Sequence, residues 1–203
     1  MIQSIICALI LVILVKSTFL KKRALYILGL ITLLVFPIPT FLVMWFFEDT
    51  TILELLQLEN ITYLKVGLGI EVGIFYAFIA LLMMNAPVFD KLPVRVETMV
   101  KDMNLSVLDC IFLSICASVG EEFLFRSGVQ FYLGPLITSV LFVAVHGYLN
   151  PFNWRMSIYG LIILPFILLI SYGFEEFGLW FAISAHFSYD LVLFLSMSTK
   201  FNK

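Results

Sequence analysis

Two histidines and two adjacent glutamates are the residues of this chain whose types and placement suggest chemistry. The 203 residues include two histidines, His146 and His186, and each lies in a long apolar run. Glu121 and Glu122 lie in a third apolar run. A carboxylate shielded from water can act as a general base. A neutral imidazole can hold a water molecule, bind a divalent metal or donate a hydrogen bond to an oxyanion. Together these groups predict water activation.

Helical spacing sorts the charged residues into pairs. Glu122 and Arg126 are four residues apart, so they share one helix face and can form an ion pair. Glu121 is turned by about 100° from Glu122 and has no partner in its own helix. His186 and Asp190 are also four apart. A buried ion network that fixes helix packing would explain the first three residues, but two histidines in apolar runs favour a catalytic cavity.

The sequence leaves the use of a metal open. Glu121, His146 and His186 would offer the carboxylate and imidazole ligands that hold zinc, here from three separate helices. The HExxH pattern, in which one helix supplies both histidines, does not occur. Both a divalent metal such as zinc and a metal-free mechanism are compatible with these residues.

Other nucleophiles have less support. No serine stands in a GxSxG pattern, and we expect Ser127 and Ser184 to be small packing residues. A thiol nucleophile, Cys116 working with His146, is a weaker alternative. The cysteines form no CxxC pair, which argues against a disulfide framework or a zinc-thiolate site. Each lies in an apolar run where a packing role is expected: Cys7, Cys110 and Cys116.

The composition requires that membrane helices position these residues. The chain is 62% hydrophobic and 13% charged, about half the charge of a soluble domain, and its mean hydropathy is +1.08. A crossing helix needs about 20 apolar residues. The sequence predicts an all-α polytopic bundle of about seven spans, with Met1 to Val15 as a span and not a cleavable signal peptide. The spans are expected at roughly 2–15, 24–47, 63–85, 105–131, 136–149, 156–173 and 177–197, with kinks at Pro37, Pro39 and Pro165.

Charge predicts the orientation of these spans. Most lysines and arginines fall in alternate loops and after the last span, whereas the other loops are acidic. Basic residues are retained in cytoplasmic loops, so we expect the amino terminus outside and the carboxyl terminus in the cytoplasm. Lys65 and Arg126 are the exceptions. The net charge of −2 gives no reason to expect a nucleic acid partner.

Three short motifs occur in order on separate apolar runs. They are Glu121-Glu122-x-x-x-Arg126, Phe142-x-x-x-His146 and His186-x-x-x-Asp190. In these motifs the chain resembles the CPBP family (CAAX protease and bacteriocin-processing, or Abi) of intramembrane proteases, relatives of the type II CAAX prenyl endopeptidase. The resemblance covers about residues 105–195, and the first hundred residues are similar only in being apolar spans.

The resemblance implies a role for each motif residue. It implies that Glu121 activates water with help from His146, and that His186 and Asp190 orient the substrate or stabilise the oxyanion. The prenyl endopeptidases have asparagine where Asp190 stands, and an anion is a poorer oxyanion donor unless it is protonated. Both a metalloprotease and a metal-free glutamate mechanism are ascribed to the family. Structural support of the site is implied for Glu122, Arg126 and Phe142.

The leading hypothesis is an intramembrane endopeptidase that cleaves a membrane-embedded or lipid-anchored peptide or protein. Residues 1–104 would form N-terminal spans and a cytoplasmic loop, and residues 105–197 the catalytic core of one compact membrane domain. The short chain is more similar to prokaryotic members, so the cell (inner) membrane is expected. Analogy suggests bacteriocin maturation, self-immunity or surface-protein processing, while prenylated substrates fit the eukaryotic relatives.

Two alternatives remain. Glu121, His146 and Asp190 could form the relay of a proton-coupled transporter, although the sequence shows no internal repeat. The chain could also be a non-catalytic immunity or scaffold protein in the membrane. The oligomeric state is not predicted, but small residues could support pairing of helices: Gly67, Gly69, Gly73 and Ala77.

Overall fold

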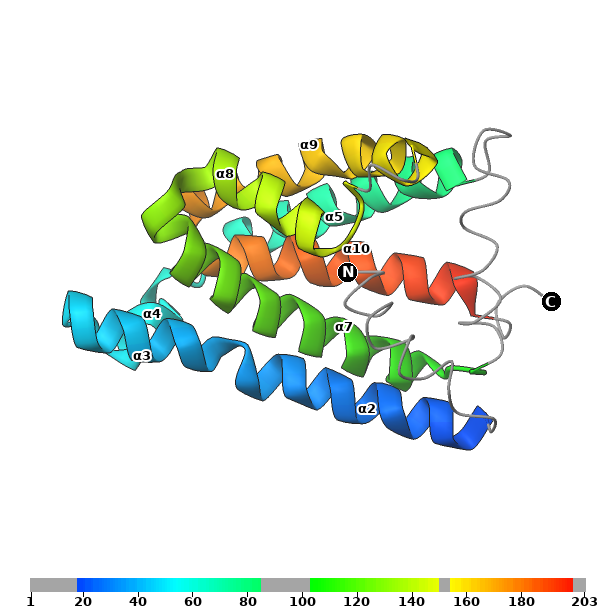
Figure 1. The fold of residues 1–203 in the computed structure, drawn as a ribbon, viewed down its shortest axis with the longest axis horizontal. Coiled ribbons are helices and arrows are strands. Elements are labelled where there is room, and N and C mark those ends of the chain that lie inside the picture. The colour runs from blue at the N-terminus through cyan, green and yellow to red at the C-terminus, as the bar shows by residue number, and fades with distance from the viewer. Residues whose placement is uncertain (1–17, 85–102, 150–153, 199–203) are drawn as a thin grey trace.

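The computed structural model describes residues 18–84, 103–149 and 154–198, in which all regular structure is helical (Figure 1). The predicted all-α class is therefore confirmed, and the predicted span 2–15 lies outside the described residues. The α-helices are α2 (Thr18–Val35), α3 (Pro37–Glu48), α4 (Ile52–Leu56), α5 (Tyr63–Met84), α7 (Val107–Glu122), α8 (Gln130–Val145), α9 (Trp154–Phe177) and α10 (Leu179–Met197). A 3-10 turn, η1 (Leu58–Asn60), precedes α5, and a π-helix, η3 (Phe123–Val129), joins α7 to α8.

Within these ranges, five stretches are long and apolar enough to cross a membrane. They are Lys22–Glu48, Tyr63–Met83, Val107–Val145, Ser157–Phe177 and Leu179–Met197. The third stretch is a hairpin, because the chain reverses direction between α7 and α8 (Figure 1). The predicted spans 105–131 and 136–149 are its two legs. The protein is thus a polytopic helical bundle, as the sequence predicts.

Glycine and proline place the breaks in these long helices. Gly134 has φ 71° and ψ 171°, a conformation open almost exclusively to glycine, and Pro135 follows it at the hairpin turn. Pro37 is the first residue of α3, so the predicted kink is the junction between α2 and α3. Helix α9 continues through Pro165. Neighbouring helices can satisfy backbone groups that proline frees in a membrane.

Helix α10 packs against α5, α7 and α9 and so lies at the centre of the bundle (Figure 1). Its contact with α5 is close because two α5 glycines face it. A Cβ atom on Gly69 would collide with Phe181 and Ser184, and one on Gly73 would collide with Ala185 and Ser188. Ala77 of α5 is fully buried. Most of the small-residue stripe noted in the sequence therefore packs within one chain.

The connection between α3 and α5 holds the beginning of α10. Trp180 Nε1 donates a hydrogen bond of 2.8 Å to the Leu56 carbonyl, and the Leu179 amide donates one of 3.0 Å to Gln57 Oε1. Thr51 and Glu54 form a capping box at the start of α4. The hydrogen bond from the Thr51 amide holds the pKa of Glu54 below its usual value. This non-spanning segment therefore fixes one end of the helix that carries His186.

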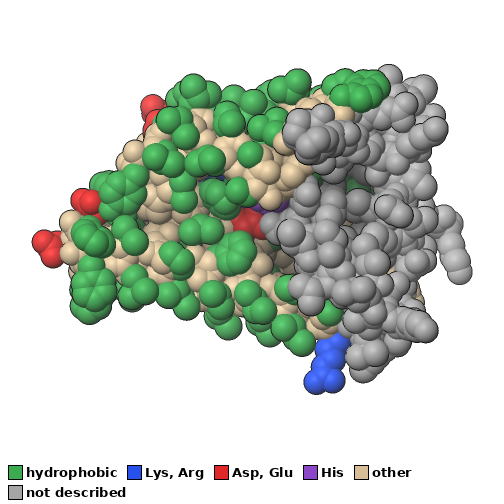
Figure 2. Space-filling model, viewed as in Figure 1, with side chains coloured by type: hydrophobic (Ala, Val, Ile, Leu, Met, Phe, Trp, Pro, Cys, Tyr) green, Lys and Arg blue, Asp and Glu red, His purple; other side chains and the backbone are tan. Residues whose placement is uncertain are grey.

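Apolar side chains cover the outer surface of the bundle, as lipid exposure requires (Figure 2). On this face acidic side chains lie at the end where α3 and α4 lie, and a basic side chain lies toward the opposite end (Figures 1 and 2). This separation of charge agrees with the alternation of basic and acidic loops. Which end faces the cytoplasm stays a prediction.

Candidate active site

The two glutamates lie at the junction between α7 and the π-helix η3. Glu121 and Glu122 end α7 and are 1% and 0% exposed. The wider π turn begins at Phe123, whose carbonyl accepts a hydrogen bond of 3.1 Å from Thr40 of α3. Single π turns inside helices occur frequently at functional sites. Here the π turn lies between the glutamates and the hairpin that brings α8 back beside α7.

Glu121 is paired with the histidine at the end of α8. Its Oε2 lies 3.3 Å from His146 Nε2, and both side chains are buried. The other ring nitrogen, His146 Nδ1, lies 2.5 Å from the Phe142 carbonyl oxygen. Because a carbonyl only accepts hydrogen bonds, Nδ1 must carry a proton, and Nε2 is the nitrogen directed toward Glu121. The structure therefore brings together the two residues that were predicted to activate water.

His186 lies between two carboxylates. Its Nδ1 is 2.7 Å from Glu122 Oε1, and its Nε2 is 3.5 Å from Asp190 Oδ2. The second oxygen of Glu122 accepts a hydrogen bond of 2.8 Å from Arg126 Nε. The predicted pairs Glu122–Arg126 and His186–Asp190 are both present, and Glu122 joins them into one buried chain of contacts. The sequence did not indicate this link, since it connects helices that lie far apart along the chain.

Phe142 lies between the two histidines. Its ring stacks on His146 with centroids 4.2 Å apart, and it meets the His186 ring edge-on at 6.1 Å. The Arg126 guanidinium lies 5.5 Å from the centroid of the same ring. A single aromatic side chain thus fixes the orientation of one imidazole and separates it from the other.

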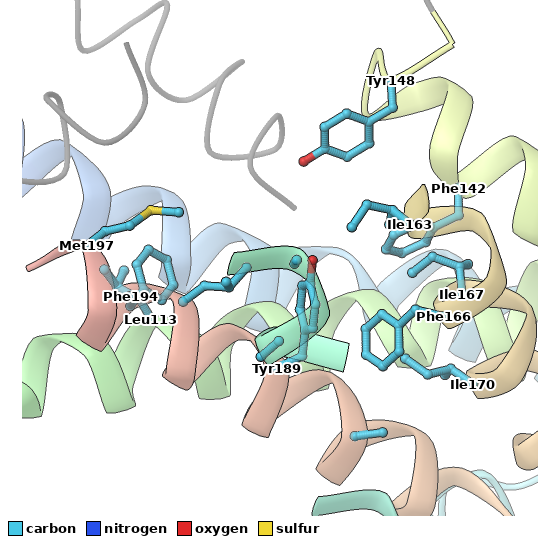
Figure 3. Packing of buried hydrophobic residues seen from close by; sticks show 14 of the residues in the cluster. Leu113, Phe142, Tyr148, Ile163, Phe166, Ile167, Ile170, Tyr189, Phe194 and Met197 are labelled. Atoms are coloured by element: carbon cyan, nitrogen blue, oxygen red, sulfur yellow. The ribbon is translucent and has the colours of Figure 1, made fainter. Parts of the chain in front are cut away.

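A small cavity of about 20 Å³ adjoins His186, and its wall is mostly apolar. Several of its apolar side chains are labelled in Figure 3, among them Phe142, Phe166 and Tyr189. Tyr189 follows His186 at one turn's distance on α10, and its ring stacks on Phe166 with centroids 4.4 Å apart. Figure 2 shows a histidine and an acidic side chain between the apolar side chains of the visible face. The cavity is lined by Phe142, Tyr148, Ile163, Phe166, Ile167, His186 and Tyr189.

A second layer of polar residues holds Arg126. Its Nη1 donates to Ser171 Oγ at 2.5 Å and contacts Gln130 Oε1 at 3.4 Å. Ser171 Oγ also lies 2.7 Å from Ser139 Oγ, and the Ser171 carbonyl accepts from Gln130 Nε2 at 2.9 Å. The sequence analysis missed Gln130, Ser139 and Ser171. Their polarity within apolar helices was the available signal, because buried polar groups need partners.

Four carboxylate oxygens in the site remain available to a reactant. Among the described residues, neither oxygen of Glu121 and neither oxygen of Asp190 has a well-aligned hydrogen bond, although all four are buried. Buried polar atoms are nearly always satisfied, so exceptions require an explanation. These oxygens could accept a hydrogen bond from a water molecule or from a substrate N–H.

The proposed metal ligands do not converge as placed. Within residues 18–84, 103–149 and 154–198, no three His, Cys, Asp or Glu side chains form a group able to hold a metal ion. His186 directs each ring nitrogen toward a carboxylate, which leaves none directed toward Glu121 and His146 together.

Cys116, the alternative thiol nucleophile, faces α2, since a Cβ atom on Gly29 would lie 3.4 Å from its Cβ.

Fold and site together define a class, a polytopic helical membrane protein with a carboxylate–imidazole centre buried between its spans. Residues 103–192 match the family described as type II CAAX prenyl endopeptidase Rce1-like. All three motifs lie in this range, and the match supports the predicted assignment to the CPBP (CAAX protease) family. The family suggests a CAAX-type intramembrane protease. Comparison with curated proteins and with solved structures finds no match.

Proposed function

We propose that this protein is an intramembrane endopeptidase that hydrolyses a peptide bond of a membrane-associated peptide or protein. The observation that carries the proposal is the 3.3 Å contact between Glu121 Oε2 and His146 Nε2 in the buried interior of the bundle. A general base must lie within hydrogen-bond reach, directly or through one water, of the proton that it takes. A water at this pair can donate to the carboxylate and to the imidazole.

The first step forms the tetrahedral intermediate. The water oxygen bonds to the peptide carbonyl carbon while one of its O–H bonds breaks, and the proton passes to Glu121. The carbonyl π electrons move to oxygen as an oxyanion. The position of His146 Nδ1–H against the Phe142 carbonyl supports a fixed role for Nε2, since the ring cannot turn without losing that hydrogen bond. In the second step the oxyanion electrons re-form the C=O bond while the C–N bond breaks, and the leaving nitrogen takes the proton back from Glu121.

His186 is the proposed oxyanion donor. Its Nδ1 donates to Glu122, and carboxylates on both sides of the ring suit a protonated imidazole that presents Nε2–H. A positioned donor of this kind accounts for about 3 to 4 kcal/mol of transition-state stabilisation in other hydrolases. Asp190, as a carboxylate, would accept a substrate N–H and thereby orient the peptide. Arg126 would act indirectly by holding Glu122.

The substrate and the setting follow from analogy and charge. We propose a membrane-embedded or lipid-anchored peptide or protein as substrate, in the cell membrane of a prokaryote, with bacteriocin maturation, self-immunity or surface-protein processing as the pathway. The distribution of basic loops supports an external amino terminus and a cytoplasmic carboxyl terminus. The apolar walls beside His186 support a substrate segment with apolar side chains.

The test is cleavage by the full chain in proteoliposomes, with a library of membrane-anchored fluorogenic peptides as probe. We expect wild type to cleave members of the library, and Glu121→Gln to lose at least about a hundredfold in rate. The matched control is Glu176→Gln, which neutralises an exposed glutamate at the end of α9 and should cleave as wild type does. Full cleavage by Glu121→Gln would overturn the proposal. Proton flux in the same vesicles, lost in Glu121→Gln without any cleavage by wild type, would favour the transporter instead.

A further inference from the structure

Glu71 is an ionisable residue inside a membrane span and outside the candidate site. It lies in α5 eight residues after Tyr63, which places it about 12 Å along the helix axis. Its side chain is exposed on the surface of the bundle. The structure gives it no hydrogen bond or ion pair with any described residue. A carboxylate that faces hydrocarbon costs several kcal/mol, so such residues nearly always have a partner.

The exposed face of α5 has the spacing of a helix-pairing seam. Six residues of this face, from Leu64 to Leu82, follow one another at intervals of four and three residues. This is the heptad pattern of left-handed helix pairs. On a helical projection the six positions fall within about 40° of one direction. Apart from Glu71 all are apolar, and four are strongly exposed: Leu64 at 71%, Phe75 at 62%, Phe78 at 57% and Leu82 at 71%. The outer α5 seam consists of Leu64, Leu68, Glu71, Phe75, Phe78 and Leu82.

The outer α5 seam lies opposite the face that packs within the chain. Gly69, Gly73 and Ala77 face α10, about half a helical turn away from the seam. Gly67 borders the seam, and a Cβ atom there would meet nothing within 4 Å. Helix α5 therefore has one face occupied by its own bundle and a second, regular face that is open.

We propose that the outer α5 seam is the interface of a homodimer in which Glu71 of one copy meets Glu71 of the other. Two copies inserted with the same orientation bring identical residues to the same depth, so their α5 helices run parallel and the two carboxyl groups meet. A pair of carboxyl groups that shares a proton forms a hydrogen bond, and each group thus satisfies the other. A two-fold interface is self-complementary in this way. A polar residue at one seam position also fixes the register of the pair.

The test is the oligomeric state of the full chain in liposomes, measured by counting photobleaching steps of labelled protein over a dilution series. We expect wild type to form dimers, and Glu71→Leu to raise the dimer dissociation constant roughly fivefold to thirtyfold. Glu71→Gln should dimerise almost as wild type does, because an amide can also bond across the interface. Glu176→Leu, the matched control on α9, should leave the dissociation constant unchanged.

Cross-linking provides a second measurement that does not depend on Glu71. Under mild oxidation Leu82→Cys should form a disulfide-linked dimer, with the wild-type chain giving the background of the native cysteines. The control Leu161→Cys replaces a leucine of α9 that is 59% exposed and should give only that background. The proposal is overturned if wild type is monomeric at every density, if Glu71→Leu dimerises as tightly as wild type, or if Leu161→Cys cross-links as well as Leu82→Cys.

Discussion

Glu121 of α7 and His146 at the end of α8 approach within 3.3 Å because the chain turns back on itself between them. The turn depends on Gly134, and the π-helix η3 changes the path of the backbone just after Glu122. Because the two legs of the hairpin run in opposite directions, Glu121 and His146 come to the same depth in the bundle. The candidate site is therefore a consequence of the hairpin as much as of the motif residues.

Replacing the glycine at the hairpin turn should destabilise the protein. Gly134→Ala forces a side chain into a backbone conformation with positive φ, at a cost of about 1 to 3 kcal/mol. Thermal unfolding in detergent should show a lower Tm than wild type. Gly67→Ala is the matched control, since its helical backbone accepts alanine and its Cβ has open space. A Tm for Gly134→Ala equal to that of Gly67→Ala would show that the turn tolerates a side chain.

Loss of the Ser171 hydroxyl should impair the site from a distance. Ser171→Ala removes the 2.5 Å hydrogen bond to Arg126, which holds Glu122 and through it His186. Leaving a buried charged donor without its partner costs about 1 to 3 kcal/mol. We expect a lower kcat with little change in KM, and recovery in Ser171→Thr, which keeps a hydroxyl.

The control for this effect is Ser196→Ala, whose hydroxyl bonds the Leu193 carbonyl of its own helix. A role for Ser171 in packing alone would lower the Tm without the selective loss of kcat. Equal kcat values for Ser171→Ala and Ser196→Ala would contradict the positioning role.

Asp190 should be replaceable by asparagine but not by leucine. Asparagine keeps the size of the side chain and can accept or donate a hydrogen bond near His186 Nε2, which lies 3.5 Å from Asp190. We expect Asp190→Asn to cleave within about tenfold of wild type, and Asp190→Leu to lose about a hundredfold or more. Peptide cleavage at matched protein levels is the measurement. If leucine were tolerated as well as asparagine, Asp190 would have no polar role.

Metal removal should leave cleavage intact. Both His186 nitrogens face carboxylates, and the described residues form no three-ligand group. We expect protein treated with a chelator to retain its rate and to contain well under one equivalent of zinc by elemental analysis. Loss of the rate with the chelator, and recovery when zinc is added back, would show that Glu121 and His146 rearrange to bind a metal.

The sequence predicts the membrane bundle well because long apolar runs and helical spacing are local properties of the chain. Each predicted span within the described residues corresponds to a helix, to the pair α2 and α3 or to a hairpin leg, and the match at residues 103–192 supports the family assignment. The i,i+4 pairs Glu122–Arg126 and His186–Asp190 follow from helical spacing alone. These features need no knowledge of how the helices are arranged.

Other features depend on tertiary structure and were not predictable. The π-helix has no sequence pattern of its own, and the contact between Glu122 and His186 requires the packing of α7 against α10. Ser171 becomes a partner of Arg126 only when α9 packs beside the hairpin, whereas Gln130 lies four residues after Arg126 and its contact follows from helical spacing. Glu71 was visible in the sequence, but its outward direction follows from the α5–α10 contact.

The most direct test of the central claim is a double-mutant cycle of Glu121→Gln and His146→Gln, with cleavage of a membrane-anchored peptide as the measurement. Residues that act as one catalytic unit show strongly non-additive losses. The account predicts that each single variant loses at least about a hundredfold in kcat and that the double variant is scarcely worse than the more impaired single one. Losses that multiply, or full activity in either single variant, would contradict joint activation of water by Glu121 and His146.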